Sequence, residues 1–468
     1  MEKKDFLGIL VKATHDCNLN CEYCFDKTLR EKYKGKIIDE EYIKKAADLV
    51  YDYASRVDWV WHGGEPTCAP MSVYENMQEY LYSKYDSNVS QTMQSNGTLF
   101  SKKWRDMALE NDINVGISYD GINSLRNGKI PQGVVAENIR EYSKYSDKYG
   151  TISVINETNY DKQIELYEEL KDLGVPNIAF NHVFSTDRKE TSEFLFDLKR
   201  YQEEYIKFSN YLFKNNLKLE RTTKLLCKTV LGQEYHLCSH GDCRGKWLGL
   251  EPDGTIVPCD RFFPEKYHMG NIKDINSIDD AFNSQGYQLL CAEIEQKYIN
   301  YCYQCPYFFH CNGGCNGDSV AKYGTAAKID EFSCNWFKKS FNASYVLLRN
   351  IEGFSDIFLH KEIKDALVTE YRYLPQEIFD AIKENLNITV NLLSDEELLN
   401  LDDKIFDTKE FRIFRLFNPL IHDGINTGIG CGECLCKNNV DTARGRKALL
   451  NEFIQDNFAE LLCILTEE

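Results

Sequence analysis

The feature that most constrains this chain is a group of three cysteines close to its N-terminus. Cys17, Cys21 and Cys24 follow the spacing C-x3-C-x2-C, directly after an apolar run at residues 6–11. Thiolate is the soft ligand that iron–sulfur clusters take, and three thiolates on one loop can hold three irons of a four-iron cluster. The loop offers no obvious fourth ligand, so one iron would stay open to a substrate or cofactor. A closed structural zinc site would instead need four protein ligands.

The remaining cysteines also favour metal chemistry over disulfides. Most of the 18 cysteines fall within residues 17–24, 238–259, 302–334 and 431–436. The N-terminal residues lack the pattern of a signal peptide and the sequence has no run of 18 apolar residues, which predicts a cytoplasmic protein without a membrane span. A disulfide framework is not expected in a cytosolic protein. The net charge of −18 argues against a nucleic-acid-binding surface.

The first half of the chain alternates between strand patterns and helix patterns. The expected strands cover residues 6–13, 57–61, 89–94, 115–118, 151–155 and 178–183. The expected helices between and after them cover residues 38–53, 71–84, 101–110, 134–148 and 160–173, with a long helix to about residue 215. Such alternation predicts parallel strands with right-handed crossovers. We therefore expect an α/β fold in which residues 1–215 form a partial (β/α)6 TIM barrel, open on one side, with its polar loops at the C-terminal face.

Two further regions follow the predicted barrel. Residues 216–350 are rich in cysteine and poor in periodic core, with a hairpin predicted at residues 244–260 around Asp253 and Gly254. A region of this kind is expected to be held together by metal. Residues 351–468 are mainly helical in pattern, and a role in peptide or partner binding is one possibility. Their three clustered cysteines are either a further metal or redox site or simply reduced thiols: Cys431, Cys434 and Cys436.

The N-terminal loop resembles the signature of the radical S-adenosylmethionine (radical SAM) superfamily, C-x3-C-x-aromatic-C, with Tyr23 as the aromatic residue. A second element of that family, GGEP, is matched by Gly63, Gly64, Glu65 and Pro66 after the second strand. The resemblance implies that the open iron binds the amino and carboxylate groups of S-adenosylmethionine. Reductive cleavage then gives a 5′-deoxyadenosyl radical that abstracts a hydrogen from the substrate. The alternatives are a zinc knuckle and an ordinary strand-to-helix turn.

Relatives in this family place polar contacts to the cofactor at the ends of later strands. The matching positions here are Ser95, Asn96, Ser118 and Asp120, although such residues also serve as helix caps. A basic residue near the cofactor carboxylate is also expected, and Arg126 is the candidate.

The second cysteine-rich region resembles the SPASM extension of radical SAM enzymes. The resemblance implies a first auxiliary cluster held by Cys238, Cys243, Cys259 and Cys315, and a second held by Cys302, Cys305, Cys311 and Cys334. With the N-terminal site this gives three 4Fe–4S clusters, one binding S-adenosylmethionine and two auxiliary. A pair of zinc sites is the alternative.

The residue after Cys259 suggests a catalytic role. In anaerobic sulfatase-maturating enzymes an aspartate at this place acts as a base near the substrate, and Asp260 occupies it here. His62 stands where those enzymes tend to carry Gln and makes the motif look more like that of ribosomal-peptide maturases. The resemblance therefore predicts a cytoplasmic oxidoreductase that modifies a precursor peptide or protein, for instance by a crosslink, with a reducing donor such as flavodoxin or ferredoxin. A sulfatase maturase that forms formylglycine and an iron–sulfur electron-transfer protein are the alternatives.

Overall fold

The computed structural model describes residues 3–85, 90–122, 125–126, 130–131, 133–184, 198–215, 217–230, 242–261, 263–305, 307–349 and 394–396. Cys238, the C-terminal cysteine group and nearly all of the expected helical region at 351–468 lie outside these residues. The chain forms two compact units, and each is described by itself. The first comprises residues 1–198, 237–303 and 312–331, and the second comprises residues 199–236, 304–311 and 332–468. In the described part of the chain, no helix has the length and apolar character needed to cross a membrane.

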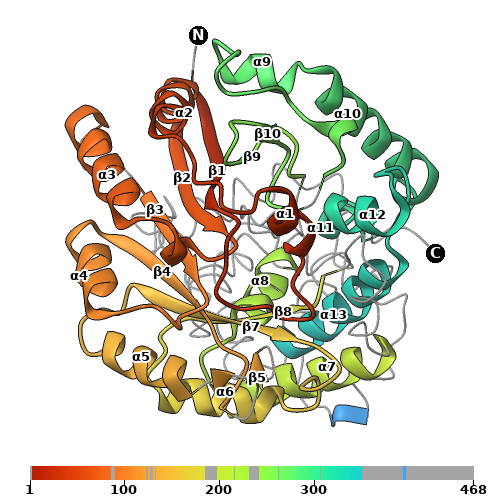
Figure 1. Ribbon diagram of the computed structural model, residues 1–468. Coiled ribbons are helices and arrows are strands. Elements are labelled where there is room, and N and C mark those ends of the chain that lie inside the picture. The colour runs from red at the N-terminus through yellow and green to blue at the C-terminus, as the bar shows by residue number, and fades with distance from the viewer. Residues whose placement is uncertain are drawn as a thin grey trace, which may run out of the picture. The chain divides into compact units, whose positions relative to one another are not determined.

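A parallel sheet forms the centre of the first unit (Figure 1). Its six parallel strands in spatial order are β1 (Lys4–Thr14), β2 (Ala54–Gly63), β3 (Ser90–Ser95), β4 (Ile113–Ser118), β7 (Tyr149–Ile155) and β8 (Ile178–His182). Every neighbouring pair in this series is parallel. The predicted six-stranded partial barrel is therefore confirmed, because each expected strand is present and pairs with the next expected strand in the sequence.

Helix α1 (Lys27–Lys32) follows the cysteine loop after β1. The other helices that connect the strands lie along the outer side of the sheet in Figure 1: α2 (Glu40–Tyr53), α3 (Met71–Tyr85), α4 (Lys102–Glu110), α5 (Gly133–Ser143) and α6 (Gln163–Asp172). A short 3-10 turn, η1 (Pro66–Cys68), precedes α3, and a small ribbon of β5 (Leu125–Arg126) and β6 (Ile130–Pro131) precedes α5. Helix α5 ends earlier than the predicted residue 148, because the Ser143 hydroxyl donates back to the Arg140 carbonyl at 2.8 Å and a turn leads into β7.

The side chains of β2 show why this sheet has an outer and an inner face. Trp61 packs edge-on against Tyr74 of α3 at 4.9 Å between ring centroids, and Tyr74 packs against Trp104 of α4 at 5.3 Å. These contacts assign Trp61 to the face covered by helices. Successive side chains of a strand point to opposite faces, so the neighbouring His62 points to the inner face. Its register partner in β1 is Lys12, which lies on the same face.

The predicted hairpin is confirmed and extends the sheet, a pairing that the sequence did not predict. Strand β9 (Trp247–Leu250) runs parallel to β1, and β10 (Ile256–Val257) pairs antiparallel with β9. Gly8 is the register partner of Trp247, and a Cβ at Gly8 would lie only 2.3 Å from the Trp247 ring. The missing side chain at Gly8 therefore makes room for this ring, which also meets Phe6 edge-on at 5.7 Å. The hairpin becomes part of the same sheet as the N-terminal strand.

The remainder of the first unit is helical. It contains η4 (Glu265–Tyr267), α9 (Ile278–Phe282), α10 (Gln285–Lys297), the π-helical turn η5 (Tyr298–Cys302) and α12 (Asn316–Tyr323). Helix α9 starts with a capping box, in which the Ser277 hydroxyl and the Asp280 carboxylate each accept a hydrogen bond from the other's backbone N–H. Helix α12 begins directly after Cys315 and ends at Gly324, which is in the left-handed conformation with a φ of 70°.

The second unit contains α7 (Leu198–Lys214), α8 (Arg221–Val230), α11 (Phe308–Cys311) and α13 (Glu331–Arg349). Aromatic contacts join α7 to α13: the Tyr205 and Trp336 rings lie 5.3 Å apart and both side chains are buried. Ile206, Ala343 and Leu347 continue this apolar contact. The end of α7 agrees with the predicted end of a long helix near residue 215.

Candidate functional site

The cysteine loop follows the carboxyl end of β1, where the sequence places it. Thr14 ends the strand, and its hydroxyl accepts from the Asp16 backbone N–H at 3.0 Å and donates to the Lys36 carbonyl at 2.9 Å. The Arg30 guanidinium of α1 donates to the Cys17 carbonyl at 3.2 Å. A turn closes between the Cys24 N–H and the Cys21 carbonyl at 3.2 Å. These bonds fix the loop between the sheet and α1.

The three thiols of this loop are half-buried. Burial raises the pKa of Cys17 to about 12 and that of Cys24 to about 11. Such thiols keep their protons until a metal displaces them, because thiolates are the form that binds metal. Among the described residues, no three His, Cys, Asp or Glu side chains converge closely enough to hold one metal ion. Three thiolates on one loop can each bind a different iron of a four-iron cluster and leave the fourth iron open, so the donor set fits such a cluster.

The Gly63–Pro66 segment lies directly against the cysteine loop. The Gly64 N–H donates to the Thr14 carbonyl at 3.1 Å, and the Glu65 N–H donates to the Asp16 carbonyl at 2.9 Å. Gly63 has a φ of 128°, and a Cβ there would lie 2.2 Å from the Thr14 carbonyl oxygen. Only glycine permits both the conformation and the close approach. The two motifs that are far apart in the sequence therefore form one continuous surface at the ends of β1 and β2.

Glu65 is completely buried, and its carboxylate accepts hydrogen bonds from residues after β2 and at the end of β3. One of its oxygens, Oε1, accepts from the Thr67 N–H at 3.0 Å, the Thr67 hydroxyl at 2.7 Å and the Ser95 hydroxyl at 2.9 Å. The other, Oε2, accepts from the Asn96 N–H at 2.6 Å. Burial raises the pKa of Glu65, while these donors favour its ionised form. The carboxylate predicted as a cofactor contact is thus bonded to its own chain and joins the end of β2 to the end of β3.

The residues expected at the ends of β3 and β4 lie close to the cysteine loop. The Asn96 side-chain amide donates to the Asn18 side-chain oxygen at 2.8 Å and approaches the Cys17 sulfur at 3.7 Å. The Tyr23 hydroxyl donates to the Asp120 carboxylate at 2.5 Å. The other Asp120 oxygen accepts from the Val154 N–H at 2.8 Å. The aromatic residue of the cysteine motif is therefore tied to the end of β4.

The two remaining predicted cofactor contacts are Ser118 and Arg126. The Ser118 hydroxyl accepts from the Gln94 side-chain amide at 3.1 Å, which links β4 to β3. Arg126 is placed in the short strand β5, and its side chain lies outside the described residues. The proposed roles of these residues toward the cofactor stay predictions.

A buried lysine that was not predicted as a site residue lies beside His62 on the inner face of the sheet. Lys12 is completely buried, and its Nζ lies 3.2 Å from His62 Nδ1. Burial and the Lys12 charge lower the pKa of His62, so its ring is neutral at neutral pH. Asp260 follows β10, and although burial raises its pKa, the charges of Lys12 and Arg261 bring it below the ordinary value. A lysine inside an otherwise apolar predicted strand was the signal available in the sequence.

His15 forms a second buried polar group beneath the cysteine loop. Its Nδ1 lies 2.9 Å from the Asp26 carboxylate and its Nε2 lies 2.5 Å from the Glu251 carboxylate. The ring also stacks on Tyr33 with centroids 5.1 Å apart. Burial opposes protonation, but the two carboxylates raise the pKa of His15 to about 9. This imidazolium connects the loop after β1 to the turn of the β9–β10 hairpin.

The described cysteines of the first predicted auxiliary set lie near one another. Burial raises the pKa of the Cys259 thiol first of all, and Asp260, Cys315 and Cys243 lie near enough to raise it further. Asn316 donates from its side-chain amide to the Cys243 sulfur at 3.5 Å. Cys238, the fourth member, lies outside the described residues. Of the second predicted set, Cys302 ends η5, Cys311 ends α11 and Cys334 lies in α13.

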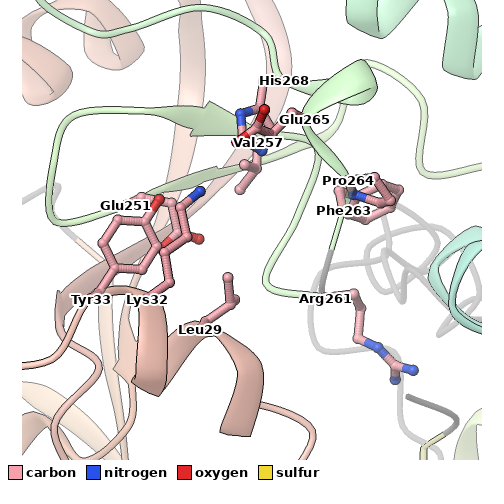
Figure 2. Close-up of a pocket in the computed structure, with 10 residues that line it drawn as sticks. All are labelled: Leu29, Lys32, Tyr33, Glu251, Val257, Arg261, Phe263, Pro264, Glu265 and His268. Atoms are coloured by element: carbon pink, nitrogen blue, oxygen red, sulfur yellow. The ribbon is translucent and has the colours of Figure 1, made fainter. Parts of the chain in front are cut away.

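A small cavity opens between α1 and the hairpin (Figure 2). Its volume is about 170 Å³, and Lys32, Tyr33, Glu251 and His268 are among the residues that line it. None of the predicted cluster or cofactor residues lines this cavity. It is therefore not the predicted cofactor site, although it adjoins the Glu251 and Tyr33 side chains that hold His15.

Comparison with protein families gives two matches. Residues 11–195 match the radical SAM superfamily, and residues 238–306 match the SPASM iron–sulfur cluster-binding domain. These ranges contain the N-terminal cysteine motif and the segment around the β9–β10 hairpin. They account for binding of S-adenosylmethionine and of iron–sulfur clusters by this chain.

Similar proteins share the same two parts. The cysteine-type anaerobic sulfatase-maturating enzyme of Clostridium perfringens is 24% identical over 368 residues, which is 74% of this chain and 98% of that enzyme. The solved structure of anSMEcpe with bound AdoMet matches with a TM-score of 0.63 at 23% identity, covering 73% of this chain and 93% of that one. Streptococcus suis SuiB bound to its precursor peptide SuiA matches with a TM-score of 0.52 at 15% identity, covering 71% and 76% of the two chains. The motifs, the fold and these matches together show that this chain contains a radical SAM domain and a SPASM iron–sulfur cluster-binding domain.

Proposed function

We propose that this enzyme modifies a peptide or protein by radical chemistry and uses three four-iron clusters to do so. The observation that carries the proposal is the parallel pairing of β9 with β1. Strand β1 leads into the cysteine loop, and the hairpin on its edge leads to Cys259 and Asp260. This pairing supports the proposal, because the residues assigned to starting a radical reaction follow β1 and the residues assigned to finishing it follow β10, the second strand from β1 in the same sheet.

The first half of the reaction would use the surface built from the ends of β1 to β4. Cys17, Cys21 and Cys24 would hold the first cluster, with S-adenosylmethionine on its open iron. The backbone of Gly63–Pro66 would lie against the cofactor, and the segment with Asn96 and Asp120 would line its other side. When bound, the reduced cluster and the cofactor supply a 5′-deoxyadenosyl radical. The electron for each cleavage would come from an outside reductant such as flavodoxin or ferredoxin.

The second half would turn the substrate radical into an oxidised product. After a carbon–hydrogen bond of the substrate has lost its hydrogen atom to the deoxyadenosyl radical, the remaining radical must lose one electron and one proton. The first auxiliary cluster, assigned to Cys238, Cys243, Cys259 and Cys315, would accept the electron. Asp260, the residue after Cys259, would accept the proton. The second cluster, assigned to Cys302, Cys305, Cys311 and Cys334, would pass electrons onward.

The name of one similar protein and the peptide bound in the solved structure of another support this substrate class. The Clostridium enzyme is a sulfatase maturase, and SuiB was solved with a precursor peptide. We favour a ribosomally made precursor peptide that receives a crosslink or a related modification. The reason is His62, which stands near the carboxyl end of β2 where sulfatase-maturating enzymes tend to carry Gln. Formylglycine formation on a sulfatase is the second candidate, favoured by the coverage of nearly the whole length of that relative. Air-sensitive clusters and reduced thiols fit a cytoplasmic enzyme.

Deuterium transfer tests the substrate class and does not require the substrate itself to be identified. Cells of the source organism are grown in heavy water, and their extract is divided into a peptide and protein fraction and a small-metabolite fraction. Reduced enzyme with unlabelled S-adenosylmethionine is then given each fraction, and the 5′-deoxyadenosine is analysed by mass spectrometry. We expect deuterium in the nucleoside with the peptide and protein fraction. Deuterium only with the small-metabolite fraction would refute the proposed substrate class.

Asp260→Asn tests the residue assigned to proton removal. The change keeps the size of the side chain but removes its ability to take a proton. We expect formation of 5′-deoxyadenosine close to that of the wild type but a loss of oxidised product of about 100-fold, the scale of a positioned general base. The matched control is Asp274→Asn, since Asp274 is exposed on the surface. If Asp260→Asn makes as much product per cleavage event as the control, Asp260 is not the base.

A further inference from the structure

A lysine is buried next to the cysteines assigned to the first auxiliary cluster. Lys297 is the last residue of α10, and its side chain is completely buried. Its Nζ donates to the Asn316 side-chain oxygen at 2.6 Å and to the Gly313 carbonyl at 3.2 Å. Lysine is almost never fully buried without a partner, because removing an ammonium group from water is costly. Its position therefore calls for a reason beyond packing.

The contact made by Asn316 connects this lysine to a cysteine sulfur. The Asn316 side-chain oxygen accepts from Lys297, and its amide nitrogen donates to the Cys243 sulfur at 3.5 Å. Asn316 itself is buried and follows Cys315, another assigned ligand. A hydrogen bond from the amide and a positive charge behind it thus point at the same sulfur.

The nearby carboxylate does not cancel this arrangement. Asp242 precedes Cys243, but the Arg244 guanidinium holds its carboxylate with bonds of 2.6 to 3.0 Å. The Asp242 and Arg244 charges are thereby paired with each other, while the lysine charge is directed toward the sulfur through Asn316. Hydrogen bonds to the sulfurs and net charge around a cluster are the main influences on its reduction potential.

We propose that Lys297, acting through Asn316, raises the reduction potential of the first auxiliary cluster. A cluster held by four thiolates is anionic, and adding an electron makes it more so. A buried cation beside one ligand stabilises the reduced form more than the oxidised form. The cluster assigned to take the electron from the substrate radical is thereby made a better acceptor. This inference rests on the proposed assignment of the auxiliary clusters, and Lys297 is a positioning residue that contacts neither substrate nor cofactor.

The test is a redox titration of Lys297→Met, which removes the charge and keeps the length of the side chain. Wild type and variant are made with Cys17, Cys21 and Cys24 all changed to alanine, so that only the auxiliary clusters titrate, and each is followed by its electron paramagnetic resonance signal. We expect the ratio of reduced to oxidised first auxiliary cluster at a fixed potential to fall about tenfold, which is about 59 mV for one electron. The matched control, Lys266→Met, removes a charge from an exposed lysine and should not shift the potential.

A second variant keeps the proposal testable if Lys297→Met does not assemble its clusters. Asn316→Ser shortens the link and leaves the lysine in place, so the potential should fall in the same direction by a smaller factor. If the variants hold the first auxiliary cluster and its reduction potential is unchanged, Lys297 does not raise that potential. The assignment of the cluster to its cysteines would then still stand. Wild-type protein with iron for only one cluster would overturn the auxiliary-cluster assignment and this inference with it.

Discussion

Cys17→Ala should lower the reductive cleavage of S-adenosylmethionine to the level of the uncatalysed reaction. The residue is one of three thiols on the loop after β1, and with only two thiolates left that loop cannot hold a cluster with one open iron. The reconstituted variant should lose about four irons per chain and form no 5′-deoxyadenosine, while the auxiliary clusters remain. Iron analysis and chromatography of the nucleoside products measure both effects.

The control for this prediction is Cys68→Ala. Cys68 ends η1, is half-buried and carries a raised pKa, chiefly from burial, with the Asn18 backbone N–H among its hydrogen-bond donors. It therefore lies beside the cysteine loop but outside the motif. The variant should retain both iron and cleavage activity. Loss of both in Cys68→Ala, or full cleavage activity in Cys17→Ala, contradicts a cluster with three protein ligands and an open iron.

Glu65→Gln should destabilise the enzyme by about 2–4 kcal/mol and weaken its affinity for S-adenosylmethionine, because buried hydrogen bonds to a charged group are among the strongest. If the amide nitrogen takes the place of Oε2, it faces the Asn96 N–H; if it takes the place of Oε1, it faces the Thr67 N–H. Neither backbone donor can turn into an acceptor. In both orientations a buried N–H loses its partner, and the segment at the end of β3 shifts.

Anaerobic thermal melting and equilibrium binding of the cofactor measure these two effects. The matched control is Glu79→Gln, the same chemical change at an exposed position of α3. It should leave the melting temperature and the affinity unchanged. A Glu65→Gln variant that melts and binds like Glu79→Gln would show that the carboxylate does not brace the site.

The barrel strands and the motif loops could be predicted because their signals are local. The strands are short apolar segments separated by helical periodicity, and the cysteine and glycine motifs directly follow two of them. The pairing of β9 with β1 could not be predicted in the same way. It depends on the fit of the Trp247 ring over Gly8, two residues slightly more than half the chain apart. The residue pattern within either segment does not predict that contact.

Distant contacts also explain which side chains of the site could not be predicted. Lys12 lies within the first predicted strand and His15 directly follows β1. The partner of Lys12 is His62, 50 residues away, and His15 has a partner 236 residues away at Glu251. The Glu65 carboxylate makes hydrogen bonds within the chain that its motif does not reveal, and its predicted contact to the cofactor stays a prediction. A motif identifies residues that a site requires, but the role of each side chain depends on tertiary contacts.

The most direct test of the central claim is whether S-adenosylmethionine binds to an iron of the N-terminal cluster. The reduced enzyme is mixed with cofactor that carries ¹⁵N at its amino group, and electron–nuclear double resonance is recorded on the cluster signal. Binding of S-adenosylmethionine to this iron predicts a ¹⁵N coupling in the wild type that is absent in Cys17→Ala. A wild-type cluster that is present and reduced but shows no ¹⁵N coupling would contradict it.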